Sequence, residues 1–352
     1  MIKRRVSRPV RIGTVTVGGD APVSVQSMTK TDTRNIKATV DQIKELTDCG
    51  CEIIRVAIPD LEAADAIQSI KKGISIPLIA DIHFDHRLAL QALKKGADGL
   101  RLNPGNIRDK EHIKKVVLAA KTRQIPIRIG VNFGSLPPGA SSELPITEHM
   151  VNIAMEQVKL LESLDFDLIK IALKAFDVPT TIEAYRLIAD RMPYPLHLGI
   201  TESGLPQTGI IRSAVGIGIL LHDGIGDTLR VSLSAHPREE VAAGFEILKS
   251  LNIREHGPVL VSCPSCGRTE ADIIALAETV SAYLRRVKKP IKVAVMGCVV
   301  NGPGEARDAD VGIACGKGRG VLFKKGEVVR TVEEHEFLEA IIREIQDIMD
   351  SA

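Results

Sequence analysis

The runs Ile53-Ile54-Arg55-Val56-Ala57 and Pro77-Leu78-Ile79-Ala80-Asp81, together with the helical stretch between them, decide the fold of this 352-residue chain. Each run is short, apolar and rich in β-branched residues, which is typical of a buried strand. A strand, a helix and a second strand in this order predict two parallel strands joined by a helical crossover.

The same unit recurs along roughly the first 250 residues. Eight β-rich runs start about 29 residues apart, which is the spacing that a strand–loop–helix–loop unit needs. The runs are Val23–Ser27, Ile53–Ala57, Pro77–Asp81, Gly99–Leu102, Ile127–Val131, Leu168–Ala172, Leu196–Ile200 and Thr228–Val231. Eight such units favour an α/β fold of the (β/α)8 TIM-barrel type. A doubly wound open sheet is the alternative, but no GxGxxG motif follows the first run. The segment Val10–Gly19 indicates a hairpin that could plug the base of the barrel.

The composition limits the partners that the protein can have. Hydrophobic residues make up 44% and charged residues 26% of the chain, as in soluble globular proteins, and no apolar run is as long as a membrane span. The basic N-terminus lacks the apolar stretch of a secretory signal, and a net charge of +2 gives no bulk attraction to nucleic acid. We therefore expect a cytoplasmic protein that has neither a membrane nor a nucleic acid as a partner.

Polar side chains gather where the predicted strands end, which is where barrel enzymes place their chemistry. They are Arg55, Asp81, His83, Arg101, Asn103, Arg128, Asn132, Lys174, Glu202, Arg230 and Ser232. Any one of the arginines could simply pair with a neighbouring carboxylate. Four arginines and a lysine converging on one mouth indicate a diphosphate-like substrate instead, because guanidinium groups bind phosphate oxygens bidentately.

A second pattern begins near residue 257 and predicts a small α/β domain over residues 257–352, behind a barrel of residues 1–252. Cys263-Pro264-Ser265-Cys266 follows one predicted strand of this domain, and Cys298 lies in a Gly/Pro loop after the next strand. A thioredoxin-like redox pair would need its own fold around it, and a zinc ribbon would need a second CxxC motif. Three cysteines after strand ends favour a [4Fe–4S] cluster.

The fourth ligand of such a cluster has two candidates. Cys315 lies in a sequence typical of a strand interior, whereas Glu305 lies in the same loop as Cys298. A carboxylate is a harder ligand than a thiolate and is more easily displaced, so Glu305 would leave one iron able to accept a substrate oxygen. We interpret the remaining cysteines, Cys49 and Cys51, as structural.

Four motifs together resemble the 4-hydroxy-3-methylbut-2-enyl diphosphate synthase family of the non-mevalonate isoprenoid pathway. They are Ser24–Thr29, Gly226–Leu233, the pair Cys263-Pro264-Ser265-Cys266 and the run Gly297–Glu305. The resemblance covers essentially the whole chain. It implies a barrel followed by a cluster domain that is similar to a domain of sulfite and nitrite reductases.

The resemblance also implies roles for individual residues. It implies Cys263, Cys266, Cys298 and Glu305 as the cluster ligands, and Asn301 as a residue beside the cluster. It implies that the substrate, 2-C-methyl-D-erythritol 2,4-cyclodiphosphate, is held by Arg55, Arg101, Asn103, Arg128, Asn132, Lys174, Arg230 and Ser232. Glu202 matches the acid/base carboxylate of the family. His83 is a second candidate for proton transfer because of its place after a predicted strand, and not because of the resemblance. The sequence departs from the family at Ala172, where serine is common, and this puts the support of Lys174 in doubt.

The implied reaction is a reductive dehydroxylation with ring opening, which gives (E)-4-hydroxy-3-methylbut-2-enyl diphosphate. Two electrons would come from a flavodoxin or a ferredoxin. Alternatives are an iron–sulfur electron carrier or sensor, and a pterin- or corrinoid-dependent methyltransferase barrel. The last predicted barrel helix, residues 237–251, runs from the catalytic face to the base, and the linker after it can span only about 20 Å. Each cluster domain would therefore cap the barrel of the partner in a head-to-tail homodimer.

Overall fold

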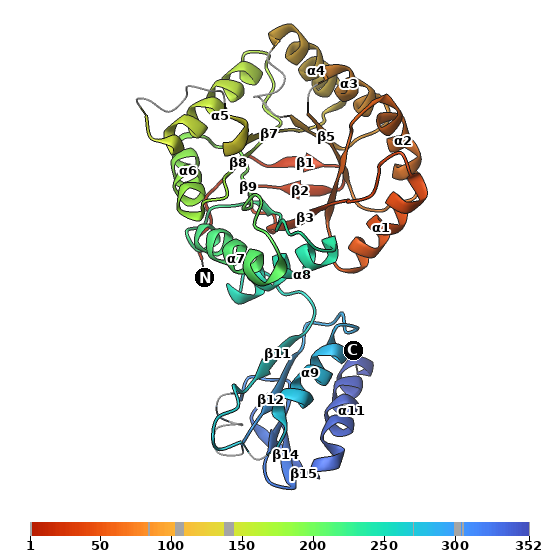
Figure 1. Ribbon diagram of the computed structural model, residues 1–352, viewed down its shortest axis with the longest axis vertical. Coiled ribbons are helices and arrows are strands. Elements are labelled where there is room, and N and C mark those ends of the chain that lie inside the picture. Colours follow the sequence, from red (N-terminus) through yellow and green to blue (C-terminus); the bar gives the residue numbers. More distant parts are fainter. Residues whose placement is uncertain are drawn as a thin grey trace. The chain divides into compact units, whose positions relative to one another are not determined.

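In a computed structural model the chain forms two compact units, Met1–Arg254 and Glu255–Ala352 (Figure 1). The structure describes residues 2–83, 85–102, 109–136, 144–269, 271–298, 304 and 306–351. Among these residues no helix combines the length and the apolar character that crossing a bilayer requires.

The first unit is built around eight parallel strands. They are β3 (Ser24–Met28), β4 (Ile53–Ala57), β5 (Leu78–Ile82), β6 (Gly99–Leu102), β7 (Ile127–Asn132), β8 (Ile169–Lys174), β9 (His197–Leu198) and β10 (Thr228–Leu229). The strand order is β8-β7-β6-β5-β4-β3-β10-β9, and an isolated parallel bridge between Ile171 and Leu196 joins the two ends of this sheet. The expected parallel barrel is thereby confirmed as a nearly closed one, and the open doubly wound sheet is excluded.

A helix follows each strand and packs on the outside of the barrel (Figure 1). The helices are α1 (Ile36–Asp48), α2 (Leu61–Lys72), α3 (His86–Lys94), α4 (Lys110–Arg123), α5 (Ile146–Glu162), α6 (Val178–Arg191), α7 (Pro206–His222) and α8 (Pro237–Ser250). Several begin at an Asn or Asp whose side chain accepts a hydrogen bond from a free backbone N–H of the first turn, as Asp60 does from Ala63 at 2.9 Å.

The alternation of residues along each strand decides which side chains enter the barrel. Ile54 and Val56 of β4, like Ile169 and Ile171 of β8, belong to the large apolar cluster between strands and helices. Successive side chains of a strand point to opposite faces, so the residues between them face the interior.

The base of the barrel is closed by an antiparallel hairpin of β1 (Val10–Ile12) and β2 (Val15–Val17). Figure 1 shows the hairpin lying across the middle of the ring of strands. Val10, Ile12 and Val17 form a separate apolar cluster with Ile53 and Ile79, which are inward-facing residues of β4 and β5. Because the hairpin fills this end with apolar side chains, the opposite end of the barrel is free for polar ones.

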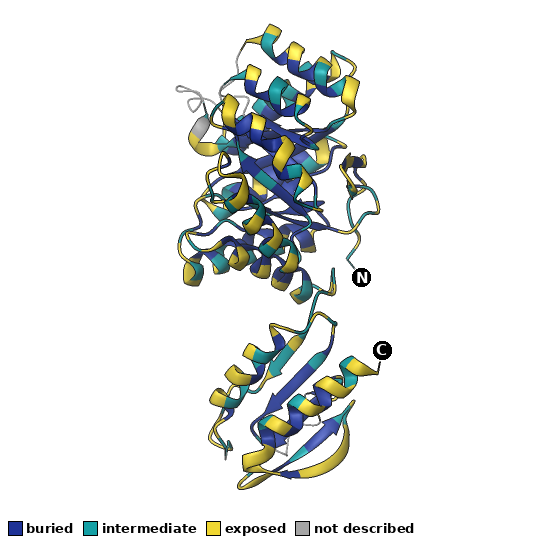
Figure 2. Ribbon diagram, turned by 90° about the vertical axis from the view of Figure 1, so that its right-hand side faces the viewer, coloured by how far each residue is buried: buried dark blue, intermediate teal, exposed yellow. Residues whose placement is uncertain are grey.

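The second unit is a five-stranded mixed sheet with helices packed on it. Its elements are β11 (Val259–Ser262), α9 (Ile273–Leu284), β12 (Lys292–Met296), β13 (Val311–Cys315), β14 (Arg319–Lys324), β15 (Glu327–Glu333) and α11 (Phe337–Asp350). The sheet runs β11-β12-β13-β14-β15, with the first three strands parallel to one another. Apolar residues of α9 and α11 pack against the sheet, and the outer faces of these helices are exposed (Figure 2). The expected small α/β domain is confirmed.

Candidate functional site

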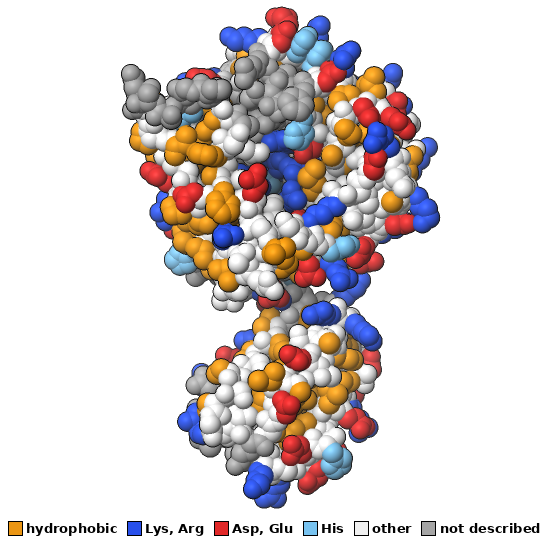
Figure 3. All heavy atoms as spheres, in the orientation of Figure 1, with side chains coloured by type: hydrophobic (Ala, Val, Ile, Leu, Met, Phe, Trp, Pro, Cys, Tyr) orange, Lys and Arg blue, Asp and Glu red, His pale blue; other side chains and the backbone are white. Residues whose placement is uncertain are grey.

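Near its C-terminal mouth, the interior of the barrel is lined by long basic side chains. Arg55 is the third residue of β4, Arg101 the third of β6 and Arg128 the second of β7. They lie within strands and not beyond the strand ends, so the placement expected from the sequence is corrected: they are inward-facing residues of the barrel wall. Figure 3 shows lysine and arginine side chains gathered in the hollow at the centre of this face.

Asp81 of β5 connects three of the side chains in the mouth. Its carboxylate lies 3.2 Å from Arg101 Nη1, 3.4 Å from Arg55 Nε and 3.5 Å from His83 Nε2. Burial alone would raise the pKa of Asp81, but Arg55 and the hydrogen bond from His83 outweigh it and hold this pKa well below its usual value. Asp81 therefore stays ionised near neutral pH and holds part of the basic lining in place.

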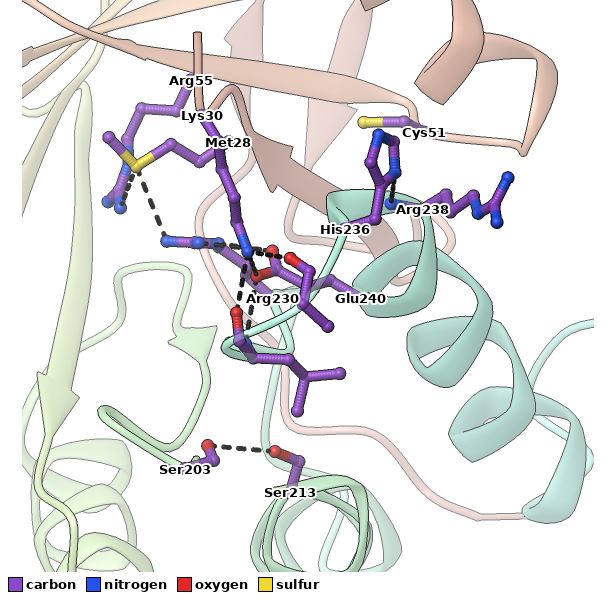
Figure 4. Close-up of polar contacts among 12 residues, drawn as sticks. Met28, Lys30, Cys51, Arg55, Ser203, Ser213, Arg230, His236, Arg238 and Glu240 are labelled. Carbon is purple, nitrogen blue, oxygen red and sulfur yellow. Dashed lines mark hydrogen bonds and ion pairs between the residues drawn. The ribbon is translucent and has the colours of Figure 1, made fainter. Parts of the chain in front are cut away.

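Glu240 of α8 holds the Arg230 side chain in place in the same way. It is 1% exposed, and its Oε2 accepts hydrogen bonds from Arg230 Nε and Nη2, both at 3.3 Å. Its Oε1 accepts one from the backbone N–H of Leu233 at 3.0 Å and lies 3.4 Å from Lys30 Nζ (Figure 4). Met28 Sδ lies 3.0 Å from Arg55 Nη2 and 3.6 Å from Arg230 Nη1, so the sulfur lies between the two guanidinium groups (Figure 4).

Lys174 has room in the barrel because a glycine faces it. A Cβ atom on Gly199 would collide with Lys174 Nζ and would lie 2.7 Å from the carbonyl oxygen of Arg230. Asn132, at the end of β7, is the register partner of Lys174 on β8. Burial, followed by the charge of Arg128, lowers the pKa of the Lys174 ammonium well below its usual value.

Basic groups outnumber acidic ones in this interior. The described side chains there include four arginines and two lysines, namely Arg55, Arg101, Arg128, Arg230, Lys170 and Lys174, against three carboxylates, Asp81, Asp227 and Glu240. Buried charges in folded proteins are normally paired. An excess of cations in this interior is suited chemically to an anion with more than one negative charge.

The structure brings together Arg55, Asp81, His83 and Arg101 by direct contacts, with Arg128, Lys174 and Arg230 beside them. Glu202 is exposed in the loop after β9, and Ser232, which follows β10, is half-buried. Glu202 has a φ of +54°, a left-handed backbone conformation that is uncommon away from glycine and concentrates at functional sites. Asn103, Asn301 and Glu305 lie outside the described residues.

Sequence reasoning missed Lys30, Glu240 and the buried Lys170. Glu240 follows Arg238 and Glu239 in a helix, so its sequence looks like that of a solvated helix face. Lys170 could have been found, because it lies four residues before Lys174 on the same strand and must therefore share its face.

The cysteines of the second unit lie at one edge of its sheet. β11 and β12 are parallel and in register, with Ser262 opposite Val295, and Cys263 N–H donates to the Val295 carbonyl at 3.0 Å. Cys263 and Cys298 therefore follow the carboxyl ends of the neighbouring strands β11 and β12. Cys266 is exposed in the loop between β11 and α9. Among the residues that the structure describes, no group of three or more His, Cys, Asp or Glu side chains is arranged so that it could hold a metal ion. None of these three cysteines is part of a disulfide, and the donor chemistry of thiols fits iron, so these residues could hold an iron–sulfur cluster.

The other cysteines are in different surroundings. Cys51 and Cys315 are buried, and burial raises the pKa of each thiol to about 12. A thiol that does not ionise is a poor metal ligand. Both residues pack in apolar clusters, which supports a structural role for them.

Comparison with known proteins agrees with this geometry over the whole chain. The model described as the GcpE TIM-barrel domain matches residues 7–245, and that of the GcpE protein C-terminal domain matches residues 259–347. The 4-hydroxy-3-methylbut-2-en-1-yl diphosphate synthase (flavodoxin) of Dehalococcoides mccartyi strain BAV1 is 64% identical over 99% of this chain and 100% of its own length. The enzyme of the same name from Thermodesulfovibrio yellowstonii is 56% identical over 98% of this chain and 100% of its own length.

Solved structures support the barrel alone. Dihydropteroate synthase from Xanthomonas albilineans superposes with a TM-score of 0.53 at 16% identity, over 70% of this chain and 98% of that one. A dihydropteroate synthase from Yersinia pestis gives 0.53 at 11% identity, over 70% of this chain and 100% of its own. The family resemblance expected from the motifs is confirmed by the close relatives: this chain belongs to the GcpE family of 4-hydroxy-3-methylbut-2-en-1-yl diphosphate synthases.

Proposed function

We propose that the protein converts 2-C-methyl-D-erythritol 2,4-cyclodiphosphate into (E)-4-hydroxy-3-methylbut-2-enyl diphosphate by a two-electron reductive dehydroxylation and ring opening. The observation that carries the proposal is the excess of buried cations in the barrel of a chain whose close relatives bear this enzyme's name. The same family membership favours the synthase over an electron carrier or a pterin-dependent methyltransferase.

The basic lining has two tasks in this reaction. Arg55, Arg101, Arg128, Lys174 and Arg230, with Asn103, Asn132 and Ser232, would bind the two phosphoryl groups. Because Asp81 and Glu240 already hold several of these cations in place, little reorganisation is needed when the diphosphate enters. When the ring opens, the released phosphate oxygen carries new negative charge, which the same cations stabilise.

Family membership implies an iron–sulfur cluster, and we propose that Cys263, Cys266, Cys298 and Glu305 hold it as a [4Fe–4S] cluster in a domain similar to that of sulfite and nitrite reductases. When bound, such a cluster supplies electrons one at a time. Asn301 would lie beside it. We further propose a flavodoxin as the electron donor, since the relatives' name includes it, with a ferredoxin as the alternative.

Glu202 would give a proton to the departing hydroxyl oxygen. Its carboxylate is exposed at the mouth, and its left-handed backbone conformation fixes the loop from which it extends. Glu202→Gln keeps the shape of the side chain and removes its proton exchange. We expect substrate binding to be retained and turnover to fall by about 100-fold or more. Unchanged turnover would remove Glu202 from the mechanism.

The direction of the chain supports a head-to-tail homodimer. α8 starts after β10 at the mouth and ends at the base, and eight residues separate its last residue from β11. We therefore propose that each cluster domain serves the barrel of the partner subunit. The expected cytoplasmic location stays a prediction.

The decisive experiment is anaerobic purification followed by iron and sulfide analysis and electron paramagnetic resonance with and without the cyclic diphosphate. We expect about four irons per chain and a spectrum of the reduced protein that changes when the substrate is added. Cys266→Ser should lose the iron, whereas Cys49→Ser, which changes a half-buried cysteine of the barrel, should retain it. Iron-free protein that still converts the substrate would overturn the proposal.

A further inference from the structure

Besides the cations proposed to bind the substrate, the barrel interior contains buried polar side chains to which the proposed reaction assigns no role. Gln26 of β3, Lys170 of β8 and His197 of β9 are 1%, 2% and 0% exposed, respectively. Within the described part of the chain, neither amide atom of Gln26, nor Lys170 Nζ, nor His197 Nε2 has a hydrogen-bond partner. A charged ammonium is costly in such a place unless an anion compensates it.

The neighbours of Lys170 are mostly cationic. Arg128 on β7 is its register partner, and Arg55 on β4 also repels it. Lys174 lies four residues further along the same strand, on the same face. His197 on β9 is in the same electrostatic environment. Charging Lys170 in the empty barrel therefore adds a cation to a group that already repels itself.

Asp227, before β10, is the carboxylate that attracts Lys170, but it is already engaged. It accepts hydrogen bonds from Ser7 Oγ and the Leu196 N–H, both at 2.8 Å, and it pairs with Arg4 at 3.2 Å. These contacts hold Asp227 at the base of the barrel, away from the cations of the mouth, so it leaves the excess of positive charge around Lys170 in place.

The groups in this interior differ in their ability to change charge. An arginine keeps its proton because its ordinary pKa is far above neutrality. A lysine adjusts, and here burial first and Arg128 second lower the pKa of Lys170 well below its usual 10.5. Any fall in positive charge in the empty barrel is therefore taken by the lysines.

We propose that Lys170 is a positioning residue whose charge follows the substrate: it is in part unprotonated in the empty barrel and takes up a proton from solvent when the diphosphate enters the mouth. This inference rests on the proposed function, because it assumes that the cyclic diphosphate is the ligand. The bound phosphates supply the negative charge that Lys170 lacks among its neighbours. In turn, the protonated Lys170 pushes the Arg128 guanidinium toward the phosphates, since like charges repel.

Proton uptake on binding has a definite sign in the pH dependence. The protonated form binds better, so the affinity of the wild-type protein falls as the pH rises through the range in which Lys170 titrates, by up to about tenfold per pH unit for one linked proton. Lys170→Met removes the charge, so it should bind more weakly at low pH and match the wild type at high pH. Lys170→Arg keeps a charge that does not titrate, so its affinity should lack this part of the pH dependence.

The test is calorimetric titration of the holoenzyme with the cyclic diphosphate, without an electron donor, in buffers of different ionisation enthalpy. The dependence of the heat on the buffer gives the number of protons taken up. We expect the wild type to take up more protons than either Lys170→Met or Lys170→Arg, because only the wild type has a titrating group at this position. Equal uptake in the three proteins would overturn the inference while leaving the proposed function intact, whereas no binding by the wild type would overturn both.

A measurement of the charge of Lys170 in the wild-type protein distinguishes proton uptake from a structural defect in the variants. In protein with ¹³C-labelled lysine, the Cε resonance that is missing from Lys170→Arg belongs to Lys170, and its shift reports protonation. We expect this resonance to move toward the charged position when the cyclic diphosphate is added at constant pH. A resonance that stays at the charged position with and without ligand would refute the proposed uptake.

Discussion

The buried carboxylate of Glu240 offers the sharpest test of how the mouth is held together. Glu240→Gln keeps the size of the side chain but removes the charge that faces Arg230 at 3.3 Å and Lys30 at 3.4 Å. Removing one partner of a buried charge pair costs about 3–5 kcal/mol, and a single hydrogen bond to a charged group contributes about 1.5–3 kcal/mol. Arg230 and Lys30 keep some access to solvent, so we expect a loss of about 2–4 kcal/mol in the free energy of unfolding.

For a unit of this size that loss corresponds to a fall in Tm of roughly 4–16 °C, measured by circular dichroism. The KM for the cyclic diphosphate should rise about tenfold, because Arg230 is no longer held in position. Glu246→Gln is the matched control on the same helix, since the Glu246 side chain is 66% exposed and its i,i+3 ion pair with Lys249 is open to solvent on the Glu246 side. It should leave both Tm and KM nearly unchanged. Equal, small effects of the two substitutions would refute the reasoning.

Three further predictions follow from the same geometry. Gly199→Ala places a methyl group against Lys174 Nζ and 2.7 Å from the Arg230 carbonyl, so steady-state kinetics should show a rise in KM of about tenfold. Asp81 has a depressed pKa, so its contribution to stability is present above about pH 4 and is lost as the pH falls further. The stability difference between Asp81→Asn and the wild type in urea unfolding should therefore be larger at pH 7 than at pH 3, and an equal difference would contradict this. The Cys51 thiol, with its pKa raised to about 12, should resist iodoacetamide at pH 8 in the folded iron-free protein while the proposed cluster cysteines react, as peptide mass spectrometry would show.

The fold could be predicted largely because its signal is local. The runs at Ile53–Ala57 and Gly99–Leu102 coincide with β4 and β6, because a short apolar run between polar segments is typical of a buried strand in any context. β9 and β10 are each only two residues long, shorter than the predicted runs. There the sheet is completed by pairing with distant segments, and local sequence does not specify where that pairing ends.

By itself the sequence determined the strand–helix repeat, the basic character of the mouth and the cysteine spacing of the second unit, because each depends on residue type and order alone. Only the tertiary structure decided which charges are buried. Lys170 lies in an apolar run that predicts a strand, but only closing the barrel decides that its charge is enclosed among other cations. Glu240 has the local sequence of an exposed residue, and packing α8 against the barrel covers it. Burial depends on what lies opposite a side chain in space, and for both residues those neighbours are distant in the chain or belong to other elements.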